Sequence, residues 1–144
     1  MNDILNEKIQ IREISGEETW PIRHKVMWPE RNLDYVKLPG DTQGHHYGLF
    51  LEEQLISVIS LFQEEEKVQF RKFATLQEFQ GQGYGTALLD FTLEKTQQLG
   101  AKAIWCNARK NKVSFYEKFG LEATDIAFTK GGKEYVIMKK TYIS

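Results

Sequence analysis

Several short stretches of the chain alternate hydrophobic and polar residues, which is the pattern of strands that bury one face. Glu53-Gln54 separates the second stretch from the third, and Gly131-Gly132 lies between the last two, so both pairs are predicted to form hairpins. A further run at 103–106, AIWC, is wholly apolar and typical of a central strand buried on both faces. The predicted alternating strands are residues 8–14, 46–52, 55–63, 68–75, 121–129 and 134–143.

A helix is predicted to follow the first strand, over residues 15–28. Ser15 is a suitable N-cap, and Glu18 stands three residues later, which is the spacing of a capping box. Pro21 is then expected in the first turn, where its missing N–H costs no hydrogen bond. From the end of this helix to Gly44 the chain is predicted to be irregular.

Two later segments also have helical spacing. The apolar side chains of residues 83–98 fall on one side of a helix, and Gly100 is its expected end. A shorter helix is predicted over residues 111–119 and ends at Gly120. The apolar stripe of the longer helix consists of Leu88, Leu89, Leu93, Thr96 and Leu99.

The succession of elements is that of a mixed α/β protein. Its length of 144 residues is that of one ordinary domain with a single core. The sequence therefore predicts a single domain over residues 1–144, in which helices flank a central mixed sheet.

The hydrophobic pattern slips by one position within the strand at 68–75. Val68 and Phe70 share one face, whereas Phe73 falls on the other. A slip of one residue is what a β-bulge produces, and bulges often lie beside active sites. A strand that is buried on both faces explains the pattern equally well.

Composition and charge exclude several classes of protein. The chain is 41% apolar and 27% charged, as globular proteins are, and its net charge of −1 gives no electrostatic basis for a nucleic-acid or anionic-membrane partner. Cys106 is the only cysteine, which excludes an internal disulfide and fits a reducing cytosol. The N-terminal residues lack a secretory pattern, and no run of about 18 apolar residues occurs. A cytoplasmic location is therefore expected.

The stretch FQGQGYGT carries the clearest functional signal. Gly81, Gly83 and Gly85 lie between a predicted strand and a predicted helix. The N-terminus of a helix offers unpaired N–H groups, and glycines let a phosphate approach them, so pyrophosphate binding is indicated. The alternative is a tight turn without a ligand. No lysine follows as in a Walker A loop, and the G-x-G-x-G spacing differs from the Rossmann fingerprint, which argues against nucleotide hydrolysis and hydride transfer.

Two motifs resemble those of a known family, the GCN5-related N-acetyltransferases (GNAT). Gln80-Gly81-Gln82-Gly83-Tyr84-Gly85 resembles the Q/R-x-x-G-x-G/A motif with which that family binds the pyrophosphate of acetyl-CoA. FYEKFGL, at 115–121, resembles the F-Y-x-K-x-G-F end of a family helix. The resemblance implies a GNAT-like fold and acetyl-CoA as acetyl donor, bound by residues from Gln80 to Thr86, with no metal.

The resemblance implies further roles. The backbone of Phe73 and Thr75 would pair with the pantetheine arm, on a bulged strand that splays apart from the strand at 103–106. One backbone N–H there would stabilise the oxyanion that develops on the thioester. Tyr116 matches the tyrosine that protonates the departing thiolate. Without the resemblance, a tyrosine at this helical spacing would be a core residue.

The chain departs from the family pattern after the apolar strand. Many members have Asn seven residues before the helix tyrosine and Ala four residues before it, where this chain has Arg109 and Lys112. Asn107 and Asn111 are the candidates to replace the missing asparagine contact with CoA. Arg109 is a candidate to meet a CoA phosphate or an acidic acceptor, and a solvated arginine is the alternative.

The two adjacent histidines and the cysteine are further candidates for catalysis. His45 and His46 are adjacent, so in a strand they point to opposite faces and are poorly placed to share a metal. One of them could serve as general base, but a hydrogen-bonded structural histidine is favoured. Cys106 lies in an apolar strand without an evident histidine partner, which disfavours a nucleophilic thiol.

The resulting prediction is an acyltransferase of the N-acetyltransferase type. It moves the acetyl group of acetyl-CoA to a primary amine by direct attack, and the alternative is a CoA-binding sensor or interaction module without catalysis. In the family the acceptor binds near the segment that is here residues 23–46. The acceptor is expected to be a small-molecule or peptide amine, and the family's frequent dimers leave a homodimer open.

Overall fold

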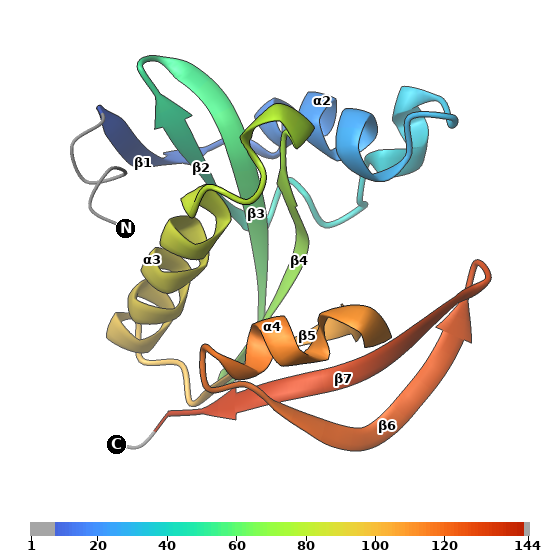
Figure 1. Ribbon diagram of the computed structural model, residues 1–144. Helices are drawn as coiled ribbons and strands as arrows, with labels where there is room; N and C mark the ends of the chain where they lie inside the picture. The colour runs from blue at the N-terminus through green and yellow to red at the C-terminus, as the bar shows by residue number, and fades with distance from the viewer. Residues whose placement is uncertain (1–7, 143–144) are drawn as a thin grey trace. The chain divides into compact units, whose positions relative to one another are not determined.

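The computed structural model describes residues 8–142 and confirms the predicted succession of strands and helices (Figure 1). Ile143, the end of the last predicted strand, lies outside the described residues. In order, the elements are β1 (Ile9–Ile14), α2 (Gly16–Met27), the 3₁₀ helix η1 (Leu33–Val36), β2 (His45–Leu51), β3 (Gln54–Glu64), β4 (Lys67–Thr75), the 3₁₀ helix η2 (Gln77–Phe79), α3 (Tyr84–Gln98), β5 (Ala103–Arg109), the 3₁₀ helix η3 (Lys110–Lys112), α4 (Val113–Glu117), β6 (Glu122–Lys130) and β7 (Lys133–Thr141).

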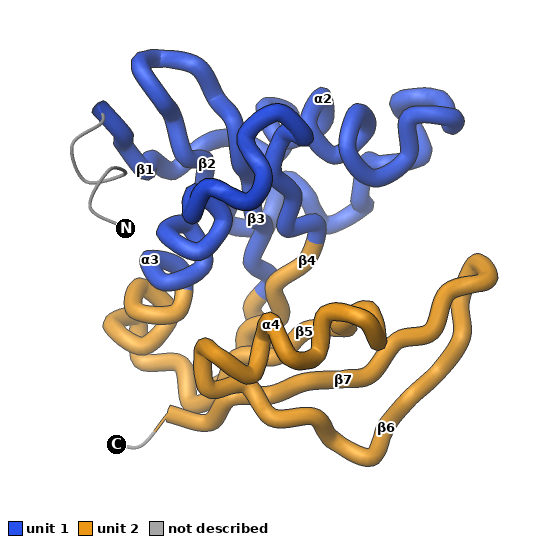
Figure 2. Tube along the Cα trace, in the orientation of Figure 1, with its two compact units in different colours: residues 1–62, 72–92 blue, residues 63–71, 93–144 orange. Residues whose placement is uncertain are grey.

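The strands form a seven-stranded mixed sheet in the order β1-β2-β3-β4-β5-β7-β6, which confirms the predicted α/β class. The chain divides into two compact units (Figure 2). Unit 1 comprises residues 1–62 and 72–92, and unit 2 comprises residues 63–71 and 93–144. The single-domain prediction concerns how these units combine, and it stays a prediction.

In unit 1 the predicted capping box starts α2. The N–H of Glu18 donates to Ser15 Oγ at 3.2 Å, and the N–H of Ser15 donates to Glu18 Oε1 at 2.9 Å. The expected place of Pro21 was wrong, because it is the sixth residue of the helix and lies beyond the first turn. A proline there removes the hydrogen bond to the carbonyl four residues earlier, and α2 continues past it to Met27.

Both faces of the unit 1 sheet are covered. Tyr47 of β2 contacts Phe91 of α3, with ring centroids 5.4 Å apart, so α3 packs on the face of Tyr47. Its neighbour His46 points to the opposite face and is 2% exposed. The antiparallel β2–β3 hairpin turns at Glu52 and Glu53, both at positive φ (46° and 75°), one residue earlier than predicted.

The end of α3 differs from prediction in one residue. Leu88, Leu89, Leu93 and Thr96 are buried as the apolar stripe predicts, but Leu99 is 61% exposed. The helix ends at Gln98, and Gly100 has φ of +88°, so the chain turns away before Leu99 can extend the stripe.

In unit 2, β5 lies between β4 and β7. Its parallel pairing with β4 runs from Lys67–Ala103 to Gln69–Trp105, while its antiparallel pairing with β7 continues to Arg109. The β6–β7 hairpin turns at Gly131 and Gly132 as predicted, both with positive φ.

Candidate active site

The glycine run in unit 1 forms the entry to α3. Gly81 and Gly83 have φ of +76° and +95°, in the left-handed region that side chains with a β-carbon rarely adopt. A β-carbon added to Gly81 would meet nothing within 4 Å, so its conformation and not crowding requires glycine. The helix begins at Tyr84, and the carbonyl of Gly83 accepts its first backbone bond from Ala87 at 3.0 Å.

Gly85 is required for a different reason. It lies in α3 at an ordinary φ, but a β-carbon there would lie 3.3 Å from Thr75 Oγ1 and 3.4 Å from the ring of Phe73. The first turn of the helix therefore packs closely on the end of β4. The structure thus brings Phe73, Thr75 and Gly85 together.

The loop presents backbone donors to solvent. Gln80 to Gly83 are exposed. Among the described residues, the N–H groups of Gly83, Gly85 and Thr86 have no protein acceptor, as expected at a helix start. Together with the positive end of the dipole of a 15-residue helix, these donors suit an anion such as a pyrophosphate.

Side chains fix the loop to β4. Gln80 Nε2 donates to the carbonyl of Thr75 at 2.8 Å, and Thr75 Oγ1 is 2.8 Å from Ser57 Oγ on β3. Within β4, Lys72 has φ of +56°. The strand is therefore irregular next to Phe73, where the hydrophobic pattern slips.

In unit 2, Tyr116 of α4 packs among aromatic rings. Its ring centroid is 5.7 Å from that of Phe70 and 5.2 Å from that of Phe115. Burial, and to a lesser degree the nearby Cys106, raises the pKa of the Tyr116 phenol. Its hydroxyl has no hydrogen-bond partner among the described residues. Most buried tyrosines find such a partner, so this hydroxyl is available to a ligand.

Asn107 and Arg109 are not brought to the side of β5 that Tyr116 contacts. Both are exposed, and they alternate with the buried Cys106 and Ala108, so they face the other side of the strand. Burial raises the pKa of Cys106 to about 12, which keeps the thiol protonated and agrees with the expectation that it is no nucleophile.

Sequence reasoning missed a buried polar network in unit 1. Arg23, fully buried, donates to both carboxylate oxygens of Asp41, to the carbonyl of Val36 and to Ser60 Oγ. His46 Nδ1 is 2.7 Å from Ser60 Oγ, and its Nε2 is 2.8 Å from the carbonyl of Asp41. The favoured reading of His46 as a structural histidine agrees with these bonds. Arg23 is the first residue of the segment 23–46 near which the acceptor is expected to bind, but its burial removes it from any surface there.

His45 and His46 point to opposite faces, as predicted. His45 is exposed and lies 3.2 Å from Glu13. No group of three or more histidine, cysteine or acidic side chains that could hold a metal ion is found in the described part of the chain. Among residues 8–142, no helix is long and apolar enough to cross a membrane.

Comparison with known sequences decides the family. The sequence model of the acetyltransferase (GNAT) domain matches residues 15–142. The uncharacterized N-acetyltransferase YitI of Bacillus subtilis (strain 168) is 30% identical over 143 residues, covering 92% of this chain and 96% of YitI. The chain belongs to the GNAT family. The resemblance drawn from the two motifs is thereby confirmed.

Solved structures share the GNAT fold. A candidate N-acetyltransferase from Lactobacillus plantarum matches with a TM-score of 0.83 at 22% identity, covering 94% of this chain and 99% of that one. A GNAT family acetyltransferase from Elizabethkingia anophelis, with acetyl-CoA bound, matches with a TM-score of 0.74 at 18% identity, covering 93% and 98%.

Membership in the GNAT family establishes the type of reaction. The protein is an N-acetyltransferase that takes its acetyl group from acetyl-CoA. The alternative of a binding module without catalysis is set aside. GNAT enzymes act on small-molecule or peptide amines.

Proposed function

We propose that residues from Gln80 to Thr86 bind the pyrophosphate of acetyl-CoA through backbone N–H groups. The observation that carries this proposal is the exposed glycine loop at the start of α3, whose amide donors have no protein acceptor among the described residues. Gly81, Gln82 and Gly83 give an anion direct access to the backbone. Tyr84, 3% exposed, anchors the start of the helix in the core.

The pantetheine arm of acetyl-CoA would lie along β4. Bound acetyl-CoA supplies an activated thioester, and the backbone of Phe73 and Thr75 would hold its arm by strand-like hydrogen bonds. The left-handed backbone at Lys72 supports this assignment, because irregularities of this kind in a strand often lie beside active sites. One of these N–H groups would donate to the oxyanion of the reacting thioester.

Direct attack requires four steps of bond and proton transfer. A neutral primary amine adds to the carbonyl carbon of the thioester, and the nitrogen releases a proton to solvent. The carbon–sulfur bond then breaks and leaves an amide and a thiolate. Tyr116 protonates the thiolate, which completes CoA, and the resulting phenolate regains a proton from solvent. The hydroxyl of Tyr116, which has no described protein partner, supports this role, and the raised pKa keeps the phenol protonated at neutral pH.

Asn107 and Arg109 are assigned a further contact with CoA. Both side chains are exposed on the side of β5 away from Cys106. Arg109 would meet a phosphate of CoA in place of the asparagine that many family members carry, with Asn107 beside it. Loss of acetyl-CoA affinity in Arg109→Ala, with Lys110→Ala as a charge-matched neighbour, would support this contact.

Calorimetry and thiol release together test the proposed function. Acetyl-CoA should bind the wild-type protein, and CoA should be released when a panel of primary amines is added. Binding without release from any amine would refute direct acetyl transfer. Absence of binding would refute the assignment of the glycine loop.

A further inference from the structure

Arg31 lies on an aromatic surface between α2 and η1. Its guanidinium carbon is 4.6 Å from the ring centroid of Tyr35 and 5.9 Å from that of Trp28. These two rings meet edge to face, with centroids 5.1 Å apart. The guanidinium is therefore held against a fixed aromatic support, and less side-chain freedom is lost when it binds a further group.

No carboxylate satisfies this guanidinium. Among the described residues Arg31 forms no ion pair and no side-chain hydrogen bond. The nearby Asp34 pairs with Lys37 at 2.9 Å instead. The planar fork of an arginine matches a carboxylate or phosphate by paired hydrogen bonds, and here that fork is unoccupied by any described protein group.

Arg12 provides an internal contrast. It lies over the ring of Phe50 at 4.1 Å, but its guanidinium also bonds Gln10 and pairs with Glu53 at 3.2 Å. Both arginines are thus stacked on aromatic rings, and only the one at position 12 has an acidic partner within the described residues.

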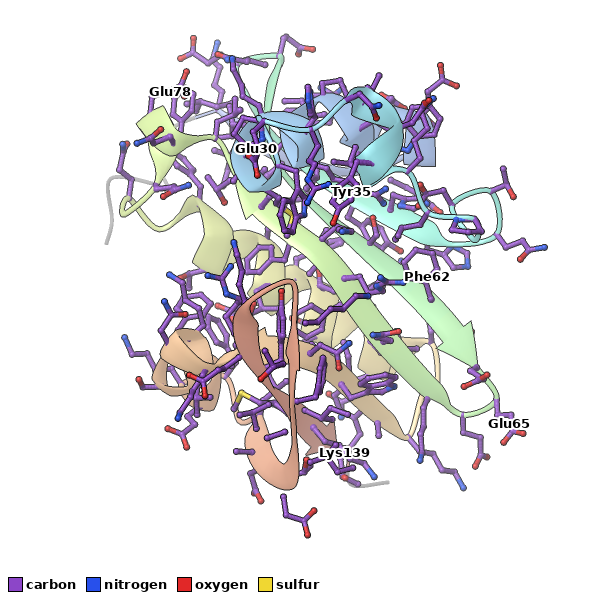
Figure 3. All side chains as sticks on the ribbon, turned by 90° about the vertical axis from the view of Figure 1, so that its right-hand side faces the viewer. Glu30, Tyr35, Phe62, Glu65, Glu78 and Lys139 are labelled. Carbon is purple, nitrogen blue, oxygen red and sulfur yellow. The ribbon has the colours of Figure 1, made fainter. Side chains whose placement is uncertain are left out.

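The segment that packs against Arg31 is exposed to solvent and is held in place by a buried hydrogen bond. Tyr35 and Leu33 are 46% and 41% exposed, so both side chains are accessible to a ligand. The same segment is fixed by Arg23, which binds the carbonyl of Val36 at 2.9 Å. Figure 3 shows Tyr35 on the surface of unit 1, at the end that also carries Glu78 of η2, just ahead of the glycine run.

We propose that Arg31 binds an oxyanion of the acceptor, so that the substrate class is a small primary amine that also carries a carboxylate or a phosphate. The apolar part of such a molecule would lie on Tyr35 and Leu33. This inference rests on the proposed function, in which a separate element, the glycine loop, binds the cofactor. It deepens that function by giving the acceptor a charge and a binding residue.

Matched acceptors test the inference. Leucine, phenylalanine, 4-aminobutyrate and 5-aminopentanoate are compared with their neutral amides, and phosphoethanolamine with ethanolamine, by thiol release from acetyl-CoA. One of the two charged series, the carboxylates or the phosphate, should be preferred. For that series we expect kcat/KM to be about 10- to 100-fold higher than for the matching neutral amines. The carboxylate and phosphate arms distinguish the two anions, and the two ω-amino acids report the preferred distance between amine and charge.

Variants assign the preference to Arg31. Arg31→Ala should raise KM for the preferred charged acceptor about tenfold or more and leave neutral acceptors and acetyl-CoA affinity unchanged. Arg31→Lys should recover only part of the loss, because a lysine lacks the planar fork. Arg12→Ala removes an equally stacked arginine from the same unit and should change neither series.

Each contrary result overturns the inference. Equal kcat/KM for charged and neutral acceptors would do so, as would an equal loss for both in Arg31→Ala. Reduced acetyl-CoA affinity in Arg31→Ala would move the residue to the cofactor site. If no acceptor turns over, saturation-transfer NMR measures the binding of the same compounds in the presence of CoA. The inference is refuted if no compound binds in a way that depends on Arg31. Acetyl-CoA calorimetry on the wild type reports separately on the proposed function.

Discussion

Arg23 and Asp41 form a buried bidentate pair, with Nη1–Oδ2 and Nη2–Oδ1 distances of 2.8 and 2.9 Å. The pair joins α2 to the turn that precedes β2, and the N–H of Leu38 and the indole N–H of Trp20 also donate to Asp41. Arg23 Nε is buried without a partner in the described part of the chain, so the guanidinium depends on this carboxylate for its charge compensation. The pair therefore fixes the segment that carries Arg31.

Asp41→Asn should destabilise the protein strongly. Removing one charge of a buried pair leaves the other uncompensated, which typically costs about 3–5 kcal/mol of unfolding free energy. The matched variant is Asp34→Asn, because Asp34 pairs with Lys37 in a partly exposed bridge. It should cost less than about 1 kcal/mol. Urea denaturation of both variants measures the difference, and equal losses would contradict the structural role of Arg23–Asp41.

The same carboxylate gives the protein an acid-sensitive stability. Burial alone would raise the pKa of Asp41, but the hydrogen bonds from Arg23, Leu38 and Trp20 outweigh it and lower the pKa from 3.8 to about 2. Because the folded-state pKa is depressed, the stabilisation is complete above the unfolded value and is lost as the pH falls from about 4 to 2. It amounts to about 2 kcal/mol. Urea midpoints measured between pH 2 and 5 should show this slope in the wild type and a smaller one in Asp41→Asn.

His46 is predicted to support the fold and not the reaction. The carbonyl of Asp41 can only accept, so His46 Nε2 carries the proton, and Nδ1 accepts from Ser60 Oγ. His46→Ala should leave two buried groups unpaired and cost about 1–3 kcal/mol. His45→Ala, at an exposed site on the same strand, should cost little. A change in acceptor KM without a loss of unfolding free energy in His46→Ala would return His46 to the reaction.

In unit 1, the start of α2 could be predicted from the sequence, whereas the buried polar network could not. The capping box of Ser15 and Glu18 is a local signal, so α2 was predicted to begin where it does. The contact of Arg23 with Ser60 joins residues 37 positions apart, and no periodicity marks such a pair. An arginine in an amphipathic helix is normally solvated, so only the tertiary structure shows this one to be buried.

In the candidate site, too, local features could be predicted from the sequence, whereas contacts that depend on the tertiary structure could not. The glycine run and the strand–helix order were readable because φ and helix-start requirements are local. The hydrophobic slip near Phe73 had two explanations, and the positive φ of Lys72 favours the irregular strand. The open guanidinium of Arg31 could not be predicted, since its lack of a carboxylate depends on where Asp34 and other acidic groups lie in space.

Gly83→Trp should abolish acetyl-CoA binding for a reason other than backbone strain. Gly100→Trp is the matched control, because Gly83 and Gly100 have similar φ (+95° and +88°) and flank the same helix at opposite ends. Both variants should lose about 1–2 kcal/mol of unfolding free energy to the left-handed conformation. Only Gly83→Trp should lower acetyl-CoA affinity, by about tenfold or more, because its side chain covers the amide donors. Calorimetry that finds equal affinities in the two folded variants would refute the pyrophosphate assignment.

Tyr116→Phe should separate catalysis from packing. The ring and its contacts with Phe70 and Phe115 remain, and the hydroxyl has no described protein partner to lose, so the unfolding free energy should change little. We expect kcat to fall about 10²–10⁴-fold with acetyl-CoA affinity retained. Tyr142→Phe is the opposite case. It loses the 2.8 Å hydrogen bond to the carbonyl of Leu93, so it should cost about 1 kcal/mol of stability and leave kcat unchanged.

The pH dependence of turnover provides an independent check on Tyr116. Burial raises the pKa of its phenol above 10, so the protonated, donating form persists at any pH at which the enzyme is assayed. The rate should therefore rise with pH as the acceptor amine loses its proton, and it should reach a plateau with no decline from Tyr116 below about pH 10. Tyr116→Phe should lower this plateau without moving the acidic limb, because that limb belongs to the acceptor. A wild-type plateau in the variant, measured with a productive acceptor, would make Tyr116 a packing residue only.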